Sequence, residues 1–249
     1  MIASMIFFPT REFETKPQDF GMTAEDVWCK TADGIKLHGW YFDAKKEGGL
    51  NLLFFHGNAG NISIRLSQAK EWTERGISVL LLDYRGFGKS EGAIKHGDDL
   101  IKDAQAALEW LKKNKRVDIS QMILFGESIG AVPAIELASR YKFKAIIIEA
   151  PFTSIKELAK KHYGMAPDFM LKDFLMDNES KIGKLQTPVF ILHGTEDEVV
   201  PFEMGTRLFE KAPEPKQFLA ITGAHHNDIT MVGGEEFYEK PSQFILGQK

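Results

Sequence analysis

The chain has 249 residues, of which 43% are apolar and 27% are charged, and its formal net charge is −4. This mild acidity gives no electrostatic reason to expect a nucleic-acid partner. The single cysteine, Cys29, excludes an intramolecular disulfide and is typical of a reducing compartment. The sequence contains neither a Cys-x-x-Cys pair nor a histidine pair with the spacing of a metal site, so we expect no bound metal.

The apolar stretch from Met1 to Phe8 is far shorter than the roughly 18 residues that a membrane-spanning helix needs. It also lacks the basic start of a signal peptide, so the expected location is cytoplasmic. The stretch can pack on the protein's own core, on a second subunit or on a bilayer surface. The sequence does not rank these three, and it leaves the oligomeric state open.

Strands and helices are predicted to alternate along the chain. Asp26–Lys30 and Ile35–Phe42 read as an antiparallel hairpin around Ala32-Asp33-Gly34. Further strands are predicted at Leu50–Phe55, Ile77–Leu82, Met122–Phe125, Lys144–Ile148, Val189–Leu192 and Gln217–Ile221. Helices are predicted at Ile62–Arg75, Asp98–Lys113, Ala131–Arg140 and Glu235–Leu246. This order predicts a single α/β domain over residues 1–249, with a mostly parallel sheet and helices on both faces.

The segment 152–187 is longer than a usual crossover between two parallel strands. It contains several aromatic residues, among them Phe152, Tyr163 and Phe169. One interpretation is a crossover helix with ordinary core contacts. The other is a small cap that gives a binding site an apolar wall and substrate-binding side chains.

The motif Gly126-Glu-Ser128-Ile-Gly130 joins a predicted strand directly to a predicted helix. Such a sharp turn crowds the backbone, and the two glycines relieve the crowding. The turn holds Ser128 out at the carboxyl end of the sheet, beside the positive end of the next helix. These features predict that Ser128 is a nucleophile.

A serine hydroxyl needs a base within hydrogen-bond reach, and the base needs a partner that fixes its tautomer. Asp197 is the predicted acid, chosen over its charged neighbours because it lies mid-loop before a helix that begins at Pro201. His226 is the predicted base, and His225 should point away from it because adjacent residues in an extended loop face opposite sides. His56 and His193, which precede glycines at strand ends, are predicted to brace loops.

The oxyanion of a tetrahedral intermediate needs two hydrogen-bond donors. One is expected from the backbone N–H of Ile129. The other is expected at Asn58, in the small-residue loop after Leu50–Phe55. A plain turn residue is the alternative interpretation of Asn58. A phosphate-binding loop is not favoured, because neither Gly-x-x-x-x-Gly-Lys-[Ser/Thr] nor Gly-x-Gly-x-x-Gly follows a strand.

With these residues in place, the chain resembles the α/β-hydrolase superfamily, and within it the Bem46-like branch that includes the mammalian ABHD13 and ABHD17 types. The matching motifs are His56-Gly-Asn-Ala-Gly-Asn61, Asp83-Tyr-Arg-Gly86, Gly126-Glu-Ser-Ile-Gly130, Glu149-Ala-Pro-Phe152, His193-Gly-Thr-Glu-Asp197 and His226-Asn-Asp228. The resemblance implies Ser128 as nucleophile, Asp197 as acid and His226 as base, with Asn58 and Ile129 as oxyanion donors.

The resemblance also implies hydrolysis of carboxylic esters or thioesters without a cofactor. Members of the branch often carry an N-terminal membrane anchor, whereas this chain begins where such an anchor would end. Pro133 departs from the pattern, and we expect it to distort the helix after Ser128.

The expected substrate is a small-molecule or lipid-like acyl ester, and peripheral membrane contact remains open. Peptide or amide hydrolysis by the same three residues and a non-catalytic binding module on a hydrolase scaffold are the rival interpretations.

Overall fold

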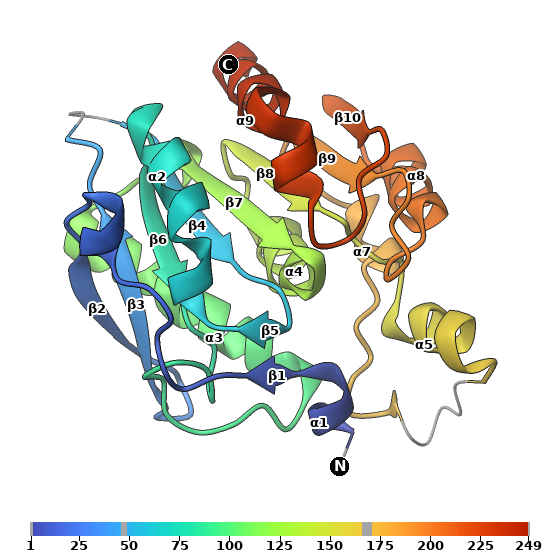
Figure 1. Cartoon of the computed structure of the whole chain (residues 1–249), viewed down its shortest axis with the longest axis horizontal. Coiled ribbons are helices and arrows are strands. Elements are labelled where there is room, and N and C mark those ends of the chain that lie inside the picture. Colours follow the sequence, from blue (N-terminus) through green and yellow to red (C-terminus); the bar gives the residue numbers. More distant parts are fainter. Residues whose placement is uncertain (1, 46–48, 166–170, 249) are drawn as a thin grey trace.

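The computed structural model describes residues 2–45, 49–165 and 171–248. Eight strands form one sheet in the order β10-β9-β8-β7-β4-β6-β3-β2 (Figure 1). The strands from β10 to β6 pair in parallel, and β3 and β2 add an antiparallel edge. Their bounds are β2 Glu25–Lys30, β3 Lys36–Phe42, β4 Asn51–Phe55, β6 Ser78–Leu82, β7 Met122–Glu127, β8 Ala145–Glu149, β9 Val189–Gly194 and β10 Lys216–Ile221. The predicted mostly parallel sheet and the N-terminal hairpin are confirmed.

The central strands are buried along their whole length. Every residue of β4, β6, β8 and β9 is buried, as expected for parallel strands that are covered on both faces. This burial explains why the sequence shows continuous apolar runs at these positions instead of alternating apolar and polar residues.

Helices cover both faces of the sheet. One face packs on α3 (Gly97–Trp110), α4 (Ala131–Arg140) and α8 (Phe202–Lys211). The other packs on α2 (Leu66–Glu74) and α9 (Ile229–Gly247), which lie in front of the sheet in Figure 1. Because the helices return the chain between parallel strands, all strands from β10 to β6 direct their carboxyl ends toward one edge of the sheet.

The N-terminal segment packs on the body of the protein. After the short helix α1 (Ala3–Ile6), Phe7 is buried in the core, and β1 (Phe8–Pro9) pairs in parallel with β5 (Ala59–Gly60). A 3-10 turn, η1 (Pro17–Phe20), then leads into the hairpin. Phe7 thus packs on the protein's own core, whereas Met5 and Phe8 keep more than half of their side chains exposed.

Several helix boundaries differ from the predicted ones. The segment predicted as one helix from Ile62 begins with a 3-10 turn, η2 (Ile62–Arg65), and α3 gives way after Trp110 to a π turn, η3 (Leu111–Lys115). The last helix starts at Ile229, earlier than predicted, and is broken at Gly234, whose φ of 51° and ψ of −131° are not helical. Glycine tolerates this backbone geometry, and the helix predicted from Glu235 corresponds to the piece that follows the break.

The expected distortion of α4 by Pro133 is not observed. A 3-10 turn, η5 (Ser128–Gly130), precedes α4, and the helix runs without a break from Ala131 to Arg140. Pro133 is therefore the third residue of α4, where a backbone N–H has no partner within the helix. Proline costs little at such a position.

The segment 152–187 forms helix α5 (Ile155–Tyr163) and the short helix α7 (Glu179–Ile182), and η4 (Ile119–Gln121) precedes β7. Ser154 caps α5 by accepting a hydrogen bond from the Glu157 N–H at 3.2 Å. None of the helices in the described part of the chain combines the length and the apolar character that crossing a bilayer demands.

Candidate active site

Ser128 occupies a strained turn between β7 and α4. Its φ of 53° is unusual for a residue with a side chain. The flanking glycines are required by space, because a Cβ on Gly130 would lie 2.1 Å from the carbonyl oxygen of Phe55 and one on Gly126 would lie 2.6 Å from that of Gly130. The backbone of the turn is thus pressed against β4, and the Ser128 side chain is held at the carboxyl edge of the sheet.

Ser128, His226 and Asp197 form one line of hydrogen bonds. The distance from His226 Nε2 to Ser128 Oγ is 3.2 Å, and the distance from His226 Nδ1 to Asp197 Oδ2 is 2.7 Å. The three residues follow β7, β10 and β9, whose carboxyl ends meet at the same edge. With the proton on Nδ1 donated to Asp197, the Nε2 lone pair can accept the Ser128 hydroxyl proton.

Asp197 is held as a carboxylate. Burial opposes its ionisation, but hydrogen bonds from His193 and His226 and from the Val200 N–H outweigh that effect and keep the pKa of Asp197 well below its usual range. Asp197 Oδ1 accepts the N–H groups of Val199 at 2.9 Å and Val200 at 2.7 Å. The carboxylate is therefore charged and fixed in orientation at neutral pH.

The other histidines near the site have different surroundings. His193 Nε2 lies 2.9 Å from the Val200 carbonyl oxygen and 3.3 Å from Asp197 Oδ2, so it braces the loop that carries the acid. His56 Nδ1 lies 2.7 Å from the Gly57 carbonyl oxygen. His225 is exposed and contacts Glu198 at 3.1 Å instead of Ser128. Each of the three is placed as the sequence predicted.

Asn58 and Ile129 both line the cavity that contains Ser128. The Asn58 side chain contacts the N-terminal segment, because its Nδ2 donates a hydrogen bond to the Ile6 carbonyl oxygen at 2.7 Å. The Asn58 carbonyl oxygen accepts the Phe8 N–H at 2.8 Å. The backbone N–H of Asn58 and the second N–H of its side-chain amide form no hydrogen bond among the contacts given above.

The cavity at Ser128 has a volume of about 600 Å³. Apart from Ser128, His226, Asn58 and Asn227, most of its wall is apolar. Besides Ile129 and Phe152, the apolar wall comes from four segments: the N-terminal segment, the loop after β4, α5 with the residues that follow it, and the loop after Asp197. No carboxylate, lysine or arginine side chain is among the described residues that line it.

Two of the three predicted substrate-binding residues lie in this cavity. Phe152 is a buried part of the wall, and Tyr163, at the end of α5, is exposed at its mouth. Phe169 lies outside the described residues. His162 ties α5 to the acid loop through a 2.6 Å contact between its Nε2 and the Val199 carbonyl oxygen. Within the segment 152–187, the contacts of α5 favour the cap interpretation.

The N-terminal wall was not anticipated from the sequence. Ile2, Met5, Ile6 and Phe8 all line the cavity, held there by the pairing of β1 with β5 and by the hydrogen bond from Asn58. The apolar character of the segment was a usable signal for burial. Which surface the segment covers could not be read from the apolar residues alone.

A pair of acidic residues beside the site, the half-buried Glu127 and the buried Glu149, was also missed. Glu127, directly before Ser128, accepts two hydrogen bonds from Arg65, at 2.7 Å from Nε and 2.6 Å from Nη2. Although burial alone would raise the pKa of Glu127, the Arg65 charge lowers it. Its neighbour on β8, Glu149, is buried without a hydrogen-bond partner for Oε2, and burial together with the Glu127 charge raises the pKa of Glu149 well above its usual range.

The fold is that of the α/β hydrolases. An esterase of Pyrococcus furiosus superposes with a TM-score of 0.81 at 23% identity, over 97% of this chain and 99% of that one. Residues 50–175, half of the chain, match the family model described as serine aminopeptidase, S33.

Similarity in sequence extends over nearly the whole chain. An uncharacterized protein of Mycobacterium tuberculosis is 34% identical over 98% of this chain and 89% of its own length. Human α/β-hydrolase domain-containing protein 17B is 34% identical over 89% of this chain and 75% of its own length. The chain therefore belongs to the α/β-hydrolase family, as its sequence motifs predicted.

Proposed function

We propose that the protein is a serine hydrolase that cleaves acyl esters or thioesters through an acyl-enzyme intermediate. The observation that carries this proposal is the hydrogen-bonded line from Asp197 through His226 to Ser128, which opens into an apolar cavity of about 600 Å³. The line supplies a nucleophile and a base, and the cavity supplies room for an acyl chain.

In the first half of the reaction, Ser128 Oγ attacks the carbonyl carbon while His226 Nε2 takes the hydroxyl proton. Asp197 holds the imidazole in orientation and stabilises the imidazolium that forms. The N–H groups of Ile129 and Asn58 donate to the oxyanion. Collapse of the tetrahedral intermediate transfers the proton from His226 to the leaving alcohol or thiol, leaving an acyl ester on Ser128.

In the second half of the reaction, a water molecule replaces Ser128 as the nucleophile. His226 removes a proton from a water molecule that attacks the acyl ester, and then returns the proton to Ser128 Oγ as the carboxylic acid leaves. The free enzyme is restored with no net change in its protonation.

The description of the matched family as serine aminopeptidase favours a second candidate, hydrolysis of aminoacyl amides. An aminopeptidase substrate carries an ammonium group that needs a carboxylate partner when water is excluded. The absence of a carboxylate among the described residues of the cavity wall argues for the ester.

A panel of p-nitrophenyl esters of increasing acyl length, compared with aminoacyl p-nitroanilides, tests the proposal. Each methylene buried in the cavity should raise kcat/KM by roughly three- to fourfold, until the chain outgrows the cavity. Ser128→Ala should remove the activity. A preference for the anilides would instead favour the peptidase. Turnover of neither series by a folded protein would favour a binding module.

A further inference from the structure

Exposed apolar side chains gather around the mouth of the cavity. The described part of the chain has eleven large apolar residues with exposed side chains, and five of them line this one cavity: Met5, Phe8, Tyr163, Met165 and Val199. Tyr163 and Met165 are each 67% exposed. Because water contact with such groups is unfavourable, a cluster of them on one face marks a surface that contacts something apolar.

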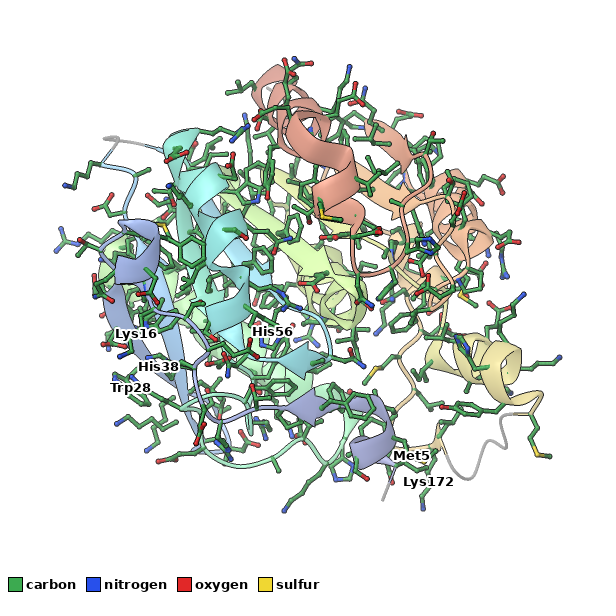
Figure 2. All side chains as sticks on the ribbon, viewed as in Figure 1. Met5, Lys16, Trp28, His38, His56 and Lys172 are labelled. Carbon is green, nitrogen blue, oxygen red and sulfur yellow. The ribbon has the colours of Figure 1, made fainter. Side chains whose placement is uncertain are left out.

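A sixth member of the cluster extends it beyond the cavity. Leu175 is 68% exposed, and it follows Phe174, whose ring centroid lies 6.3 Å from that of Phe7 at the end of α1. Leu171, in the same segment, lines the cavity. We call the surface made by α1, the carboxyl end of α5 and residues 171–175 the mouth face. It lies at the lower edge of the molecule in Figure 1, where α1 and α5 are drawn. Met5 and Lys172 are labelled at this edge in Figure 2, far from Trp28.

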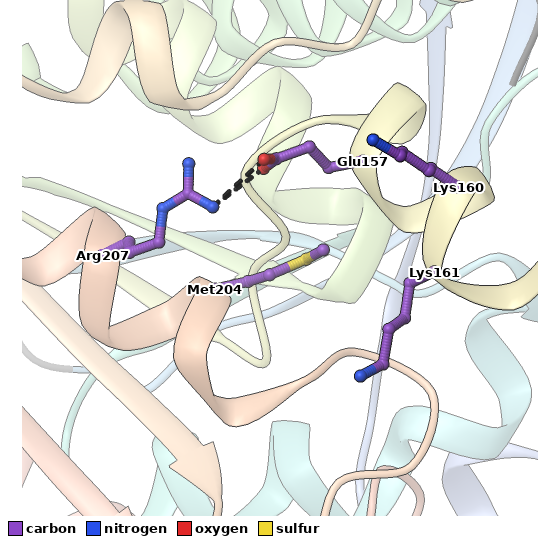
Figure 3. Close-up of a pocket in the computed structure, with 5 residues that line it drawn as sticks. All are labelled: Glu157, Lys160, Lys161, Met204 and Arg207. Atoms are coloured by element: carbon purple, nitrogen blue, oxygen red, sulfur yellow. Dashed lines mark hydrogen bonds and ion pairs between the residues drawn. The ribbon is translucent and has the colours of Figure 1, made fainter. Parts of the chain in front are cut away.

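The mouth face also carries positive charge, in a chain whose formal net charge is −4. Lys160, Lys161 and Lys172 are exposed on it, against one exposed carboxylate, Asp173, which lies 3.7 Å from His96 Nδ1. The acidic residue of α5, Glu157, is turned toward α8, where it pairs with Arg207 at 3.1 Å (Figure 3).

A hollow of about 410 Å³ lies between α5 and α8 and is lined by Glu157, Lys160, Lys161, Met204 and Arg207. Because Glu157 pairs with Arg207, the two lysines are the cations of this lining without a carboxylate partner among its described residues. Figure 3 shows these lysines on α5, with Arg207 across the hollow. Cations at the rim of an apolar surface complement the phosphates of anionic lipids, which lie just outside the acyl chains of a bilayer.

We propose that the mouth face docks on the surface of a bilayer that contains anionic lipid. The exposed apolar side chains enter the boundary between headgroups and acyl chains, and the lysines contact the phosphates. Docked in this way, the cavity opens directly onto the lipid. If the proposed hydrolase function holds, an amphiphilic ester can then pass from the bilayer to Ser128 without crossing water.

Co-sedimentation of the full chain with vesicles tests this proposal. The vesicles are phosphatidylcholine alone or phosphatidylcholine mixed with phosphatidylglycerol. Leu175→Ser removes an apolar contact outside the cavity. Its matched control is Leu246→Ser, since Leu246 is 75% exposed at the carboxyl end of α9, on the opposite side of the molecule.

A second pair of variants tests the charges. Lys160→Glu with Lys161→Glu reverses two lysines of the mouth face, and Lys113→Glu with Lys240→Glu makes the same change in net charge elsewhere. Hydrolysis of a short, water-soluble ester reports on folding in all variants. It also separates failure of the proposed function, which abolishes this hydrolysis, from failure of docking, which does not.

The expected result is binding to the mixed vesicles that weakens as salt is added. Reversal of the two mouth-face lysines should lower the affinity by at least about tenfold, and Leu175→Ser should lower it severalfold. The control variants should bind as the wild type does. Failure of the wild type to bind the mixed vesicles, or equal losses in the controls, would overturn the proposal. So would a dimer in solution that Leu175→Ser dissociates, because the mouth face would then be a protein interface.

Discussion

At the scale of single residues, the two adjacent histidines after β10 occupy different environments. His226 lies between Ser128 and Asp197, whereas His225 faces solvent beside Glu198. The contact with Glu198 raises the pKa of His225 above its ordinary value. Two residues of the same type, one position apart, therefore form a natural pair of test and control.

His226→Gln should lower kcat on a p-nitrophenyl ester by about 10⁶-fold, because no group would remain to take the Ser128 proton. His225→Gln should change kcat by less than about twofold, since its contacts are exposed and worth little. Steady-state kinetics on both variants provide the measurement. Comparable losses in the two variants would mean that the base has been misassigned.

The buried acid Glu149 predicts a pH dependence of stability. Because its pKa is raised in the folded protein, the group supports folding below its unfolded pKa of about 4.5, and this support is lost as the pH rises toward the folded pKa. Glu149→Gln should therefore gain stability relative to the wild type as the pH rises above about 4.5, by up to about 1.4 kcal/mol per pH unit.

Urea unfolding of both proteins between about pH 5 and pH 8 measures this difference. A difference that stays constant over the range would show that Glu149 ionises normally in the folded state. A difference of the opposite sign would place a cation beside it.

The residues of the hydrogen-bonded line could be predicted because each follows a recognisable strand end. Gly126 and Gly130 identify the turn at Ser128, and the order serine, aspartate, histidine distinguishes this arrangement from other serine hydrolases. The ion pair of Arg65 with Glu127 and the burial of Glu149 could not be found in this way, although Glu127 and Glu149 both lie in recognised motifs. Their importance comes from contacts between segments far apart in the sequence, and a single charged residue within a chain is ordinarily a solvated one.

At the scale of elements, the junction of β7 with α4 depends on the absence of a side chain at Gly130. A Cβ there would lie 2.1 Å from the Phe55 carbonyl oxygen, which is a backbone atom of β4 and cannot rotate away. The whole turn that carries Ser128 would have to move to relieve this contact.

Gly130→Ala should lower the free energy of unfolding by about 2 to 3 kcal/mol and displace Ser128 from His226, with loss of esterase activity. Gly247→Ala is the control, because a Cβ there meets no atom within 4 Å, and it should change stability by less than about 1 kcal/mol. Chemical denaturation measures the change in stability of the two variants, and steady-state kinetics measure the change in their esterase activity. Full activity in Gly130→Ala would contradict the close approach of the turn to β4.

Strands could be predicted at this scale more completely than helix ends. The apolar runs of β4, β6 and β8 have no competing interpretation once helices alternate with them. The break at Gly234 and the π turn after Trp110 depend on how α9 and α3 pack on the sheet, and local sequence does not encode that packing. The pairing of β1 with β5 was missed because each has two residues, too few for a periodic pattern.

At the scale of the whole molecule, the fold brings three features to one edge of the sheet: the hydrogen-bonded line, the cavity and the exposed apolar surface around the cavity. The strand ends place Ser128, Asp197 and His226, α5 and the N-terminal segment wall the cavity, and the mouth face opens outward from it. The sheet follows from the alternation of strands and helices in the sequence. The cavity does not, because its walls come from segments whose mutual placement is decided only when the chain folds.

The central claim is that Ser128 is a nucleophile activated by His226. A fluorophosphonate probe reacts with such a serine, so incubation of the wild-type protein and of Ser128→Ala with the probe, followed by peptide mapping, tests it directly. We predict that the wild type is labelled at Ser128 and that Ser128→Ala is not labelled. A folded wild-type protein that resists the probe, or label on another residue, would contradict the claim.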